Sequence, residues 1–137
     1  MKVAKEFRWE MAHRLPFHNG RCKNLHGHSY RAVIEFDGDQ LTDGMLIDFY
    51  DIFNIVNPII DKMDHSILVD SSDKELLEIA NQINDRVVVV DFPTTVENIS
   101  RFIVEEITKS NLPQKLNLIL VRVYETVDSY AEYQKKL

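Results

Sequence analysis

The 137-residue chain has a single cysteine and no apolar run that approaches the roughly 20 residues of a membrane-spanning helix. One cysteine cannot form an internal disulfide, which is typical of proteins from a reducing compartment. The N-terminal stretch MKVAKEFRWE also lacks the apolar core of a signal peptide. These absences predict a cytoplasmic protein that does not associate with a membrane.

Excess positive charge and low-complexity sequence are also missing. The chain has 16 Lys and Arg against 22 Asp and Glu, a net charge of -6, whereas a nucleic-acid-binding surface is normally basic. We therefore expect no nucleic-acid partner, although a local basic pocket for a small anion is compatible with this charge. No internal repeat or Gly/Pro/Ser-rich linker divides the chain, so residues 1–137 are interpreted as one domain of ordinary globular composition.

Hydrophobic patterning indicates both strands and helices. Alternation predicts strands, and apolar residues at helical spacing predict helices. The expected strands cover 3–15, 26–36, 45–49, 86–92 and 116–126, and the expected helices cover 49–63, 74–83 and 93–107. Pro58 is expected to kink or break the first helix, and Thr94 and Glu97 occupy capping-box positions at the start of the third. Without regular βαβ alternation, this order favours an α+β fold, an antiparallel sheet with helices packed on one face.

Three histidines fall on the apolar sides of the first two strands: His13 on the first, and His26 and His28 on the second. A lone histidine in such a place is more often a hydrogen-bonded core residue. A His-x-His pair with a third histidine on another strand instead favours a metal site. Three nitrogen ligands that leave one position open are typical of catalytic zinc. The pattern does not show whether the two strands are adjacent.

Cys22 lies in the loop just before the His-x-His pair, and its role is open. It is a buried spacer, a fourth ligand that closes a structural zinc site, or a nucleophile or base whose thiolate a nearby cation favours. Spacing does not decide between these alternatives. Its place on a glycine-containing loop slightly favours a reacting group.

Other ionisable residues have both structural and functional interpretations. Asp64 and His65 follow the first helix, where a polar helix end is common, but an Asp that orients a His is also an acid–base pair. Glu97 is explained as a capping-box residue. Glu125 lies on the apolar side of the last expected strand, where a carboxylate needs a partner with N–H groups.

Six motifs, EMAHRLP, CKNLHGHSY, GMLIDF, DKMDH, PTTVEN and VYET, resemble in sequence and order the 6-pyruvoyl-tetrahydropterin synthase / 6-carboxy-tetrahydropterin synthase family, across nearly the whole chain. The approach to the first histidine is altered here to Trp-Glu-Met-Ala-His, and the segment 70–92 looks longer than in compact bacterial members. Neither departure removes a functional position.

The resemblance implies a role for each candidate residue. His13, His26 and His28 would bind zinc, and Cys22 would be the catalytic thiol. Asp64 and His65 would form the proton-transfer pair, Glu125 would anchor the guanidine-like edge of a pterin, and Thr95 and Glu97 would lie near the same pocket. The family's substrate is 7,8-dihydroneopterin triphosphate. Its members adopt the tunnelling fold and form homohexamers from two trimers, with sites at subunit interfaces.

The short C-x-x-x-H-G-H spacing resembles the bacterial queuosine-pathway enzymes, and favours 6-carboxytetrahydropterin synthase over a pyruvoyl-forming or other pterin side-chain activity. Rival interpretations are a zinc-dependent hydrolase on an unrelated fold and a non-catalytic pterin or metal binder. Because a binder has no need of Cys22, Asp64 and His65 together, their presence favours catalysis.

Overall fold

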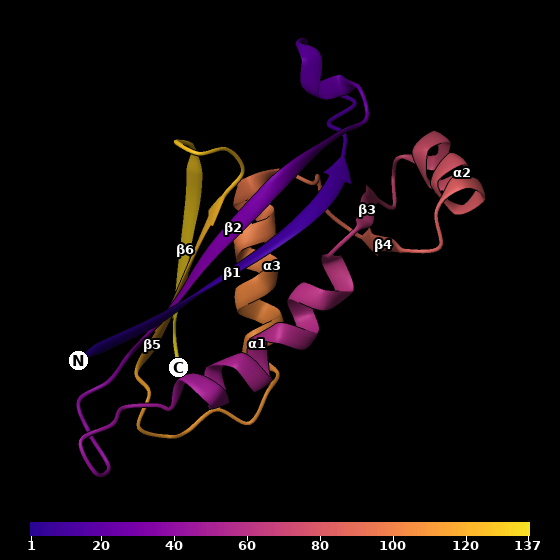
Figure 1. Ribbon diagram of the computed structural model, residues 1–137. Helices are drawn as coiled ribbons and strands as arrows, with labels where there is room; N and C mark the ends of the chain where they lie inside the picture. Colours follow the sequence, from indigo (N-terminus) through magenta and orange to yellow (C-terminus); the bar gives the residue numbers. More distant parts are fainter.

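A computed structural model describes residues 1–137, whose six strands form one sheet in the order β4-β3-β1-β2-β5-β6 (Figure 1). The strands are β1 Lys2–His13, β2 His26–Asp37, β3 Ser66–Asp70, β4 Val87–Val90, β5 Leu118–Tyr124 and β6 Tyr130–Lys136. The helices are α1 Phe49–Met63, α2 Lys74–Ile83 and α3 Val96–Thr108, and a short 3-10 turn, η1, covers Arg21–Lys23. None of the α-helices is both long and apolar enough to span a membrane.

The β1–β2 hairpin is the longest element of the fold. Its antiparallel register runs from Lys2 opposite Asp37 to His13 opposite His26. Because side chains alternate along a strand, the odd positions of β1 and the even positions of β2 share one face. That face is buried from Phe7 to His13. The two strands that carry the histidines are therefore direct neighbours.

The fold is α+β as predicted, but the sheet is mixed rather than antiparallel. β1 pairs with β3, and β3 with β4, in parallel, whereas the other three pairings are antiparallel. Helices connect the parallel strands, since β3 is reached through α1 and β4 through α2. β3 and β6 were not expected from the sequence. β3 is short and follows α1 almost directly, and β6 alternates between half-buried and exposed residues with few apolar side chains.

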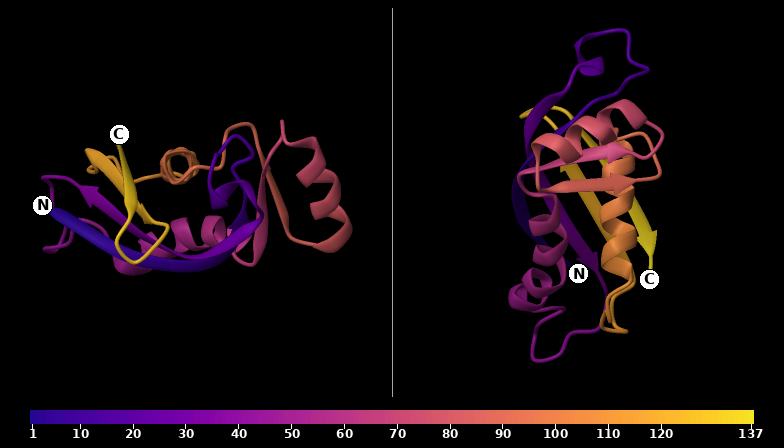
Figure 2. Two further views of the ribbon diagram at one scale, coloured as in Figure 1. Left: turned by 90° about the horizontal axis from the view of Figure 1, so that it is seen from above. Right: turned by 90° about the vertical axis from the view of Figure 1, so that its right-hand side faces the viewer.

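The helices divide between the two faces of the sheet (Figure 2). α1 and α3 pack against the main core, which includes Trp9, Tyr30 and Ile34. α2 packs on the opposite face at the β3–β4 edge, where Leu76 and Ala80 meet Ile67 and Val69. The prediction of helices on one face thus holds for α1 and α3 but not for α2.

Two local predictions are wrong, the strand at 45–49 and the capping box, and α1 is not broken at Pro58. Residues 45–48 do not form a strand: Met45 makes only an isolated bridge, and Asp48 is the N-cap of α1, its side chain accepting from Tyr50 N at 2.8 Å. α1 continues through Pro58, which is exposed, so that water can bind the carbonyl that lacks its helical donor. The capping box is shifted, because Thr95 rather than Thr94 is the N-cap of α3.

Candidate functional site

The three histidines gather at one end of the β1–β2 hairpin. His13 and His26 are paired across the ladder, and His28 is two residues further along the same face of β2. One nitrogen from each ring lies within 4.8 Å of the others, a spacing at which the three residues could hold one metal ion. The ring centroid of His26 lies 4.8 Å from the centroid of His13 and 4.8 Å from that of His28.

Backbone carbonyls orient two of the rings. His13 Nδ1 donates to the Thr94 carbonyl at 2.7 Å, and His26 Nδ1 donates to the Asn24 carbonyl at 2.8 Å. A carbonyl only accepts, so these bonds place the proton on Nδ1 and the lone pair on Nε2. The Nε2 atoms of His26 and His28 are buried without a hydrogen-bond partner. A buried polar atom without a partner is costly, and a metal ion bound to Nε2 satisfies it.

Burial also favours the neutral form of His13 and His28, which is the form that binds metal. Desolvation lowers the pKa of His13 to about 4, with smaller contributions from His26 and His28. Burial likewise lowers the pKa of His28. Only the neutral ring offers an Nε2 lone pair, so proton binding and metal binding compete at these residues. At neutral pH His13 and His28 are therefore ready to bind a cation.

Glu125, just after β5, faces the same histidines. Its carboxylate oxygens lie 3.8 Å from His13 Nε2 and 3.6 Å from His28 Nε2. Because His13 is neutral near pH 7, the first contact is not an ion pair at that pH. Burial is the main cause that raises the pKa of Glu125, and the nearby charge of Glu97 raises it further. The carboxylate is thus half-buried beside the histidine rings and the Tyr30 side chain.

The start of α3 and the neighbouring strand complete this end of the sheet. Thr95 accepts from Asn98 N as the N-cap of α3, directly after the Thr94 carbonyl that holds His13. The hydroxyl of Tyr30, a residue 1% exposed, lies 3.3 Å from His13 Nε2. Burial and the Glu125 carboxylate raise the pKa of this hydroxyl.

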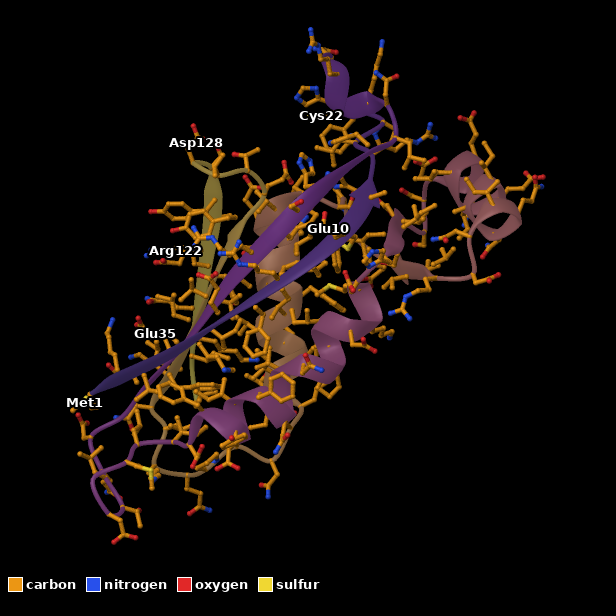
Figure 3. The ribbon with its side chains drawn as sticks, viewed as in Figure 1. Met1, Glu10, Cys22, Glu35, Arg122 and Asp128 are labelled. Atoms are coloured by element: carbon orange, nitrogen blue, oxygen red, sulfur yellow. The ribbon has the colours of Figure 1, made fainter.

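Cys22 lies in η1, within the loop that joins β1 to β2 beyond the end of the ladder (Figure 3). Its side chain is half-buried, and its carbonyl accepts from Leu15 N at 2.8 Å. The group of possible metal ligands contains the three histidines and not this thiol. The geometry thus gives an open three-nitrogen site, with Cys22 in the adjoining loop.

Asp64 and His65 form a separate pair where α1 gives way to β3. Asp64 Oδ2 lies 3.0 Å from His65 Nδ1, and Asp64 Oδ1 accepts from Glu10 N at 2.9 Å. That backbone bond is the main cause that lowers the pKa of Asp64. His65 has a left-handed backbone, with φ 57°, and its side chain is 73% exposed. The pair makes no hydrogen bond or ion pair with Cys22 or the three clustered histidines.

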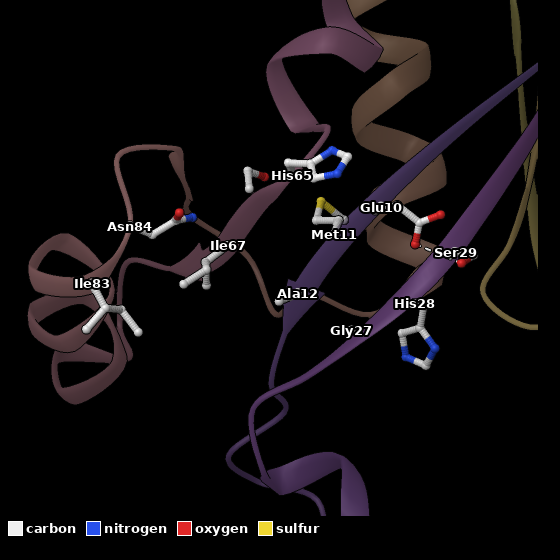
Figure 4. Close-up of a pocket in the computed structure, with 11 residues that line it drawn as sticks. Glu10, Met11, Ala12, Gly27, His28, Ser29, His65, Ile67, Ile83 and Asn84 are labelled. Atoms are coloured by element: carbon white, nitrogen blue, oxygen red, sulfur yellow. Dashed lines mark hydrogen bonds between the residues drawn. The ribbon is translucent and has the colours of Figure 1, made fainter.

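His65 borders a pocket of about 500 Å³ on the other face of the hairpin (Figure 4). Glu10 and Ser29 line it and are joined by a hydrogen bond of 2.7 Å. Both residues alternate with the histidine-bearing positions of their strands, and in Figure 4 the ring of His28 points away from them. Glu10 and Ser29 therefore face away from the histidine rings, although His28 also contributes to the lining of the pocket.

A family model described as 6-pyruvoyl tetrahydropterin synthase matches residues 2–136. The chain belongs to this family. It is 38% identical over 142 residues to the 6-carboxy-5,6,7,8-tetrahydropterin synthase of Haemophilus influenzae, covering 98% of this chain and 99% of that protein. The protein of the same name from Aquifex aeolicus is 28% identical, covering 98% of each chain.

Solved structures agree in fold with this synthase family assignment. The 6-pyruvoyl tetrahydropterin synthase of Plasmodium falciparum superposes with a TM-score of 0.82 at 19% identity, covering 100% of this chain and 98% of that one. The Caenorhabditis elegans protein of that name gives 0.73 at 20% identity, covering 98% and 95%. At this identity the likeness concerns the fold alone.

The synthase fold brings some of the predicted site residues together and leaves others apart. His13, His26, His28 and Glu125 meet at one end of the sheet, with Thr95 and Glu97 at the adjoining start of α3. Cys22 lies in the next loop, and Asp64 and His65 border the other face.

Sequence reasoning missed two residues at the histidine cluster, Tyr30 and Thr94. Tyr30 continues the two-residue spacing of His26 and His28, so its place on that face was readable from the sequence. The Thr94 backbone carbonyl accepts a hydrogen bond from His13, which lies 81 residues earlier in the chain. A backbone contact of this kind leaves no pattern of side chains in the sequence.

Proposed function

We propose that this chain is a zinc-dependent 6-carboxy-5,6,7,8-tetrahydropterin synthase, which converts 7,8-dihydroneopterin triphosphate and water to 6-carboxytetrahydropterin, acetaldehyde and triphosphate in queuosine precursor biosynthesis. The observation that carries the proposal is the cluster of three histidines, with two buried Nε2 atoms that have no partner, beside a half-buried carboxylate. The name of the Haemophilus influenzae relative supports the carboxy-forming branch.

The donor set fits zinc. Three imidazoles that bind through Nε2, two of them fixed by backbone carbonyls, match the open catalytic sites of this metal. His13, His26 and His28 would hold the ion, which supplies Lewis-acid polarisation of the substrate's side-chain oxygens. Burial of His13 keeps competing protons away at neutral pH.

Glu125 would anchor the pterin ring. A pterin presents an exocyclic amine and a ring N–H side by side, which match the two oxygens of one carboxylate. Such charge-assisted bonds would offset the cost of keeping the half-buried Glu125 carboxylate charged. The nearby charge of Glu97 favours the same N–H-rich edge, and Thr95 lies at the start of the same helix.

Cys22 and the Asp64–His65 pair would transfer protons to and from the substrate during the reaction. The Cys22 thiolate would act as a base beside the pterin ring. Asp64 holds His65 by Nδ1 and is itself fixed by the Glu10 N–H, which leaves His65 Nε2 free to exchange a proton. Triphosphate leaves as the substrate side chain rearranges, and cleavage of a carbon–carbon bond releases acetaldehyde in the carboxy-forming reaction.

A second copy of the chain would complete the site, as expected for a homo-oligomer. The exposed Asp64–His65 pair borders the face opposite the histidine cluster, so one chain does not present both to the same substrate. The Cys22→Ala and Asp64→Asn variants should each be inactive alone. Unfolding and refolding the two together should restore part of the activity in mixed oligomers. Mixed oligomers without activity would place the whole site within one chain.

Product identification tests the proposed function. Purified protein with zinc is incubated with 7,8-dihydroneopterin triphosphate, and the pterin product is identified by mass. We expect 6-carboxytetrahydropterin together with acetaldehyde. A product that keeps the three-carbon side chain would assign the protein to the pyruvoyl branch, which the family model's description names. Unchanged substrate would support a non-catalytic binder.

A further inference from the structure

The end of β1 that carries His13 pairs with β2 on one side but has little support from β3 on the other. β1 pairs with β3 at only two positions, Met11 with Ser66 and Ala12 with Ile67, so this ladder stops one residue before His13. Beyond it, Thr94 makes two contacts. Its carbonyl accepts from His13 Nδ1 at 2.7 Å, and its hydroxyl donates to the carbonyl of Arg14 at 3.2 Å. The orientation of His13 therefore depends on where Thr94 is held.

Arg14 makes a second attachment at the same place. Its guanidinium donates to both oxygens of Asp73, from Nε and from Nη2, each at 2.6 Å. The Asp73 side chain is only 6% exposed and that of Arg14 20% exposed, whereas Glu75, which accepts from Arg14 Nη1 at 3.2 Å, is 74% exposed. Two parallel charge-assisted bonds at a half-buried place give a geometrically specific contact.

Asp73 and Thr94 belong to one structural unit. Asp73 follows β3, with its N–H donating to the Asp70 carbonyl at 2.9 Å, and Thr94 follows β4. β3 and β4 are paired up to Asp70 opposite Val90. Fixing Asp73 against β1 therefore also fixes the chain that leads from β4 to Thr94.

We propose that Arg14 and Asp73 form a positioning pair for the metal ligand His13. The pair locks the β3–β4 unit against the end of β1, and this holds the Thr94 carbonyl where it fixes the His13 ring and directs Nε2 toward His26 and His28. The proposal rests on the metal site of the proposed function. The proposal also gives the segment between β3 and β4, which carries Asp73, a role in metal binding although this segment does not contact the histidine cluster.

Simple electrostatics and positioning predict different outcomes, which makes the proposal testable. Removing the positive charge of Arg14 near a divalent cation should tighten metal binding, and removing the negative charge of Asp73 should weaken it. Positioning predicts that both changes weaken it. Asp73→Asn is a mild change, because its amide oxygen can still accept from Leu76 N and cap α2.

The experiment measures the zinc affinity of metal-free protein by competition with a chromophoric chelator, together with the visible absorption bands of the cobalt-loaded form. Arg14→Gln and Asp73→Asn should each weaken zinc binding about tenfold, the lower end of the range for outer partners of metal ligands, and alter the cobalt bands. Glu75→Gln is the matched control, because it removes only the exposed Arg14–Glu75 ion pair. Its zinc affinity should stay within about twofold of the wild-type value.

Unchanged zinc affinity in both variants, or shifts of opposite sign, would overturn the positioning role even if the melting temperature falls. If Arg14→Gln fails to fold, Arg14→Lys replaces it in the test. Lysine keeps the charge but cannot make the bidentate contact with Asp73, so this variant should show the same loss of zinc affinity. Thr94→Val, which removes the hydroxyl but keeps the carbonyl, should weaken binding in the same direction. Wild-type protein that binds no zinc at the histidines would defeat the proposed metal site as well, whereas normal wild-type binding with unchanged variants defeats only the positioning pair.

Discussion

The polar groups on the two faces of the β1–β2 hairpin differ in whether they have hydrogen-bond partners. On the face of the pocket, Glu10 accepts from the Ser29 hydroxyl, and both Asp64 oxygens have partners. On the face of the histidine cluster, the Nε2 atoms of His26 and His28 are buried and have none. Within the free chain, Glu10, Ser29 and Asp64 thus have hydrogen-bond partners, whereas the Nε2 atoms of His26 and His28 have none.

This difference identifies unpartnered side-chain atoms as the clearest sign of a metal site. The ring of His28, whose Nε2 atom has no partner, points away from Glu10 and Ser29, although His28 and His65 also line the pocket of about 500 Å³. A buried lone pair without a donor costs free energy unless something outside the chain binds it. The histidine face is therefore where we expect a metal ion, and the exposed Asp64–His65 pair is where we expect a second copy or the substrate.

Removing a histidine from the cluster should have the largest effect. His28→Ala should lower the zinc content from about one per chain to near zero and abolish turnover, because a three-ligand site loses a ligand. His18→Ala is the matched control, since His18 is an exposed histidine outside the cluster. Metal analysis of the purified proteins checks this. Equal zinc content in the two variants would place the metal elsewhere.

Cys22→Ala should separate chemistry from metal binding. Cys22 is not among the possible ligands, so zinc content and melting temperature should stay at wild-type values. Turnover should fall about 10²–10⁴-fold, as expected when a general base is removed. Rate and metal measurements on the same sample decide the point. Loss of zinc together with activity would instead support a closed site with Cys22 as the fourth ligand.

Glu125→Gln should separate pterin recognition from stability. The substitution keeps the shape but replaces an acceptor oxygen with a donor, so pterin affinity should fall by about 2–4 kcal/mol. The stability of the metal-free protein should hold or rise slightly, because burial disfavours the charged carboxylate, as its raised pKa indicates. Titration calorimetry with a pterin and thermal melts test both statements. Unchanged affinity with a sharply lower melting temperature would make Glu125 a structural residue.

The pH dependence of stability should show the smallest effect. The unfolded chain protonates His13 near pH 6.5, but the folded chain does so only near pH 4. The stability of the metal-free protein should therefore decrease as the pH falls through this window, with a contribution from His13 of up to about 3 kcal/mol. Glu125, whose pKa is raised, acts in the opposite direction. Urea unfolding of the wild type and of His13→Gln, each near pH 7 and near pH 4.5, isolates the His13 contribution. If the two proteins lose the same unfolding free energy between these pH values, His13 makes no such contribution.

The sequence predicted the histidine face well because it depends on local alternation. His13, His26 and His28 follow the two-residue period of long strands, and the hairpin pairs these strands as neighbours. The start of β3 was not predictable in this way. α1 leads into it through His65 in a left-handed conformation that usually marks glycine, so no turn signal separates helix from strand.

Contacts between distant segments explain the other differences. Thr94 and Thr95 are chemically identical candidates for a helix cap, and only the packing of Thr94 against Arg14 and His13 leaves Thr95 as the N-cap. The sequence also places Asp64 beside His65 correctly, but it gives no information on which face of the sheet the pair borders. That depends on the parallel pairing of β3 with β1.

The most direct test of the metal centre is anomalous X-ray scattering at the zinc absorption edge from crystals of zinc-loaded protein. We predict one strong peak per chain, bonded to the Nε2 atoms of His13, His26 and His28 at about 2.0–2.1 Å, with an open position toward Glu125. A peak coordinated by Cys22, a peak at Asp64 and His65, or no peak at the histidines would contradict this account.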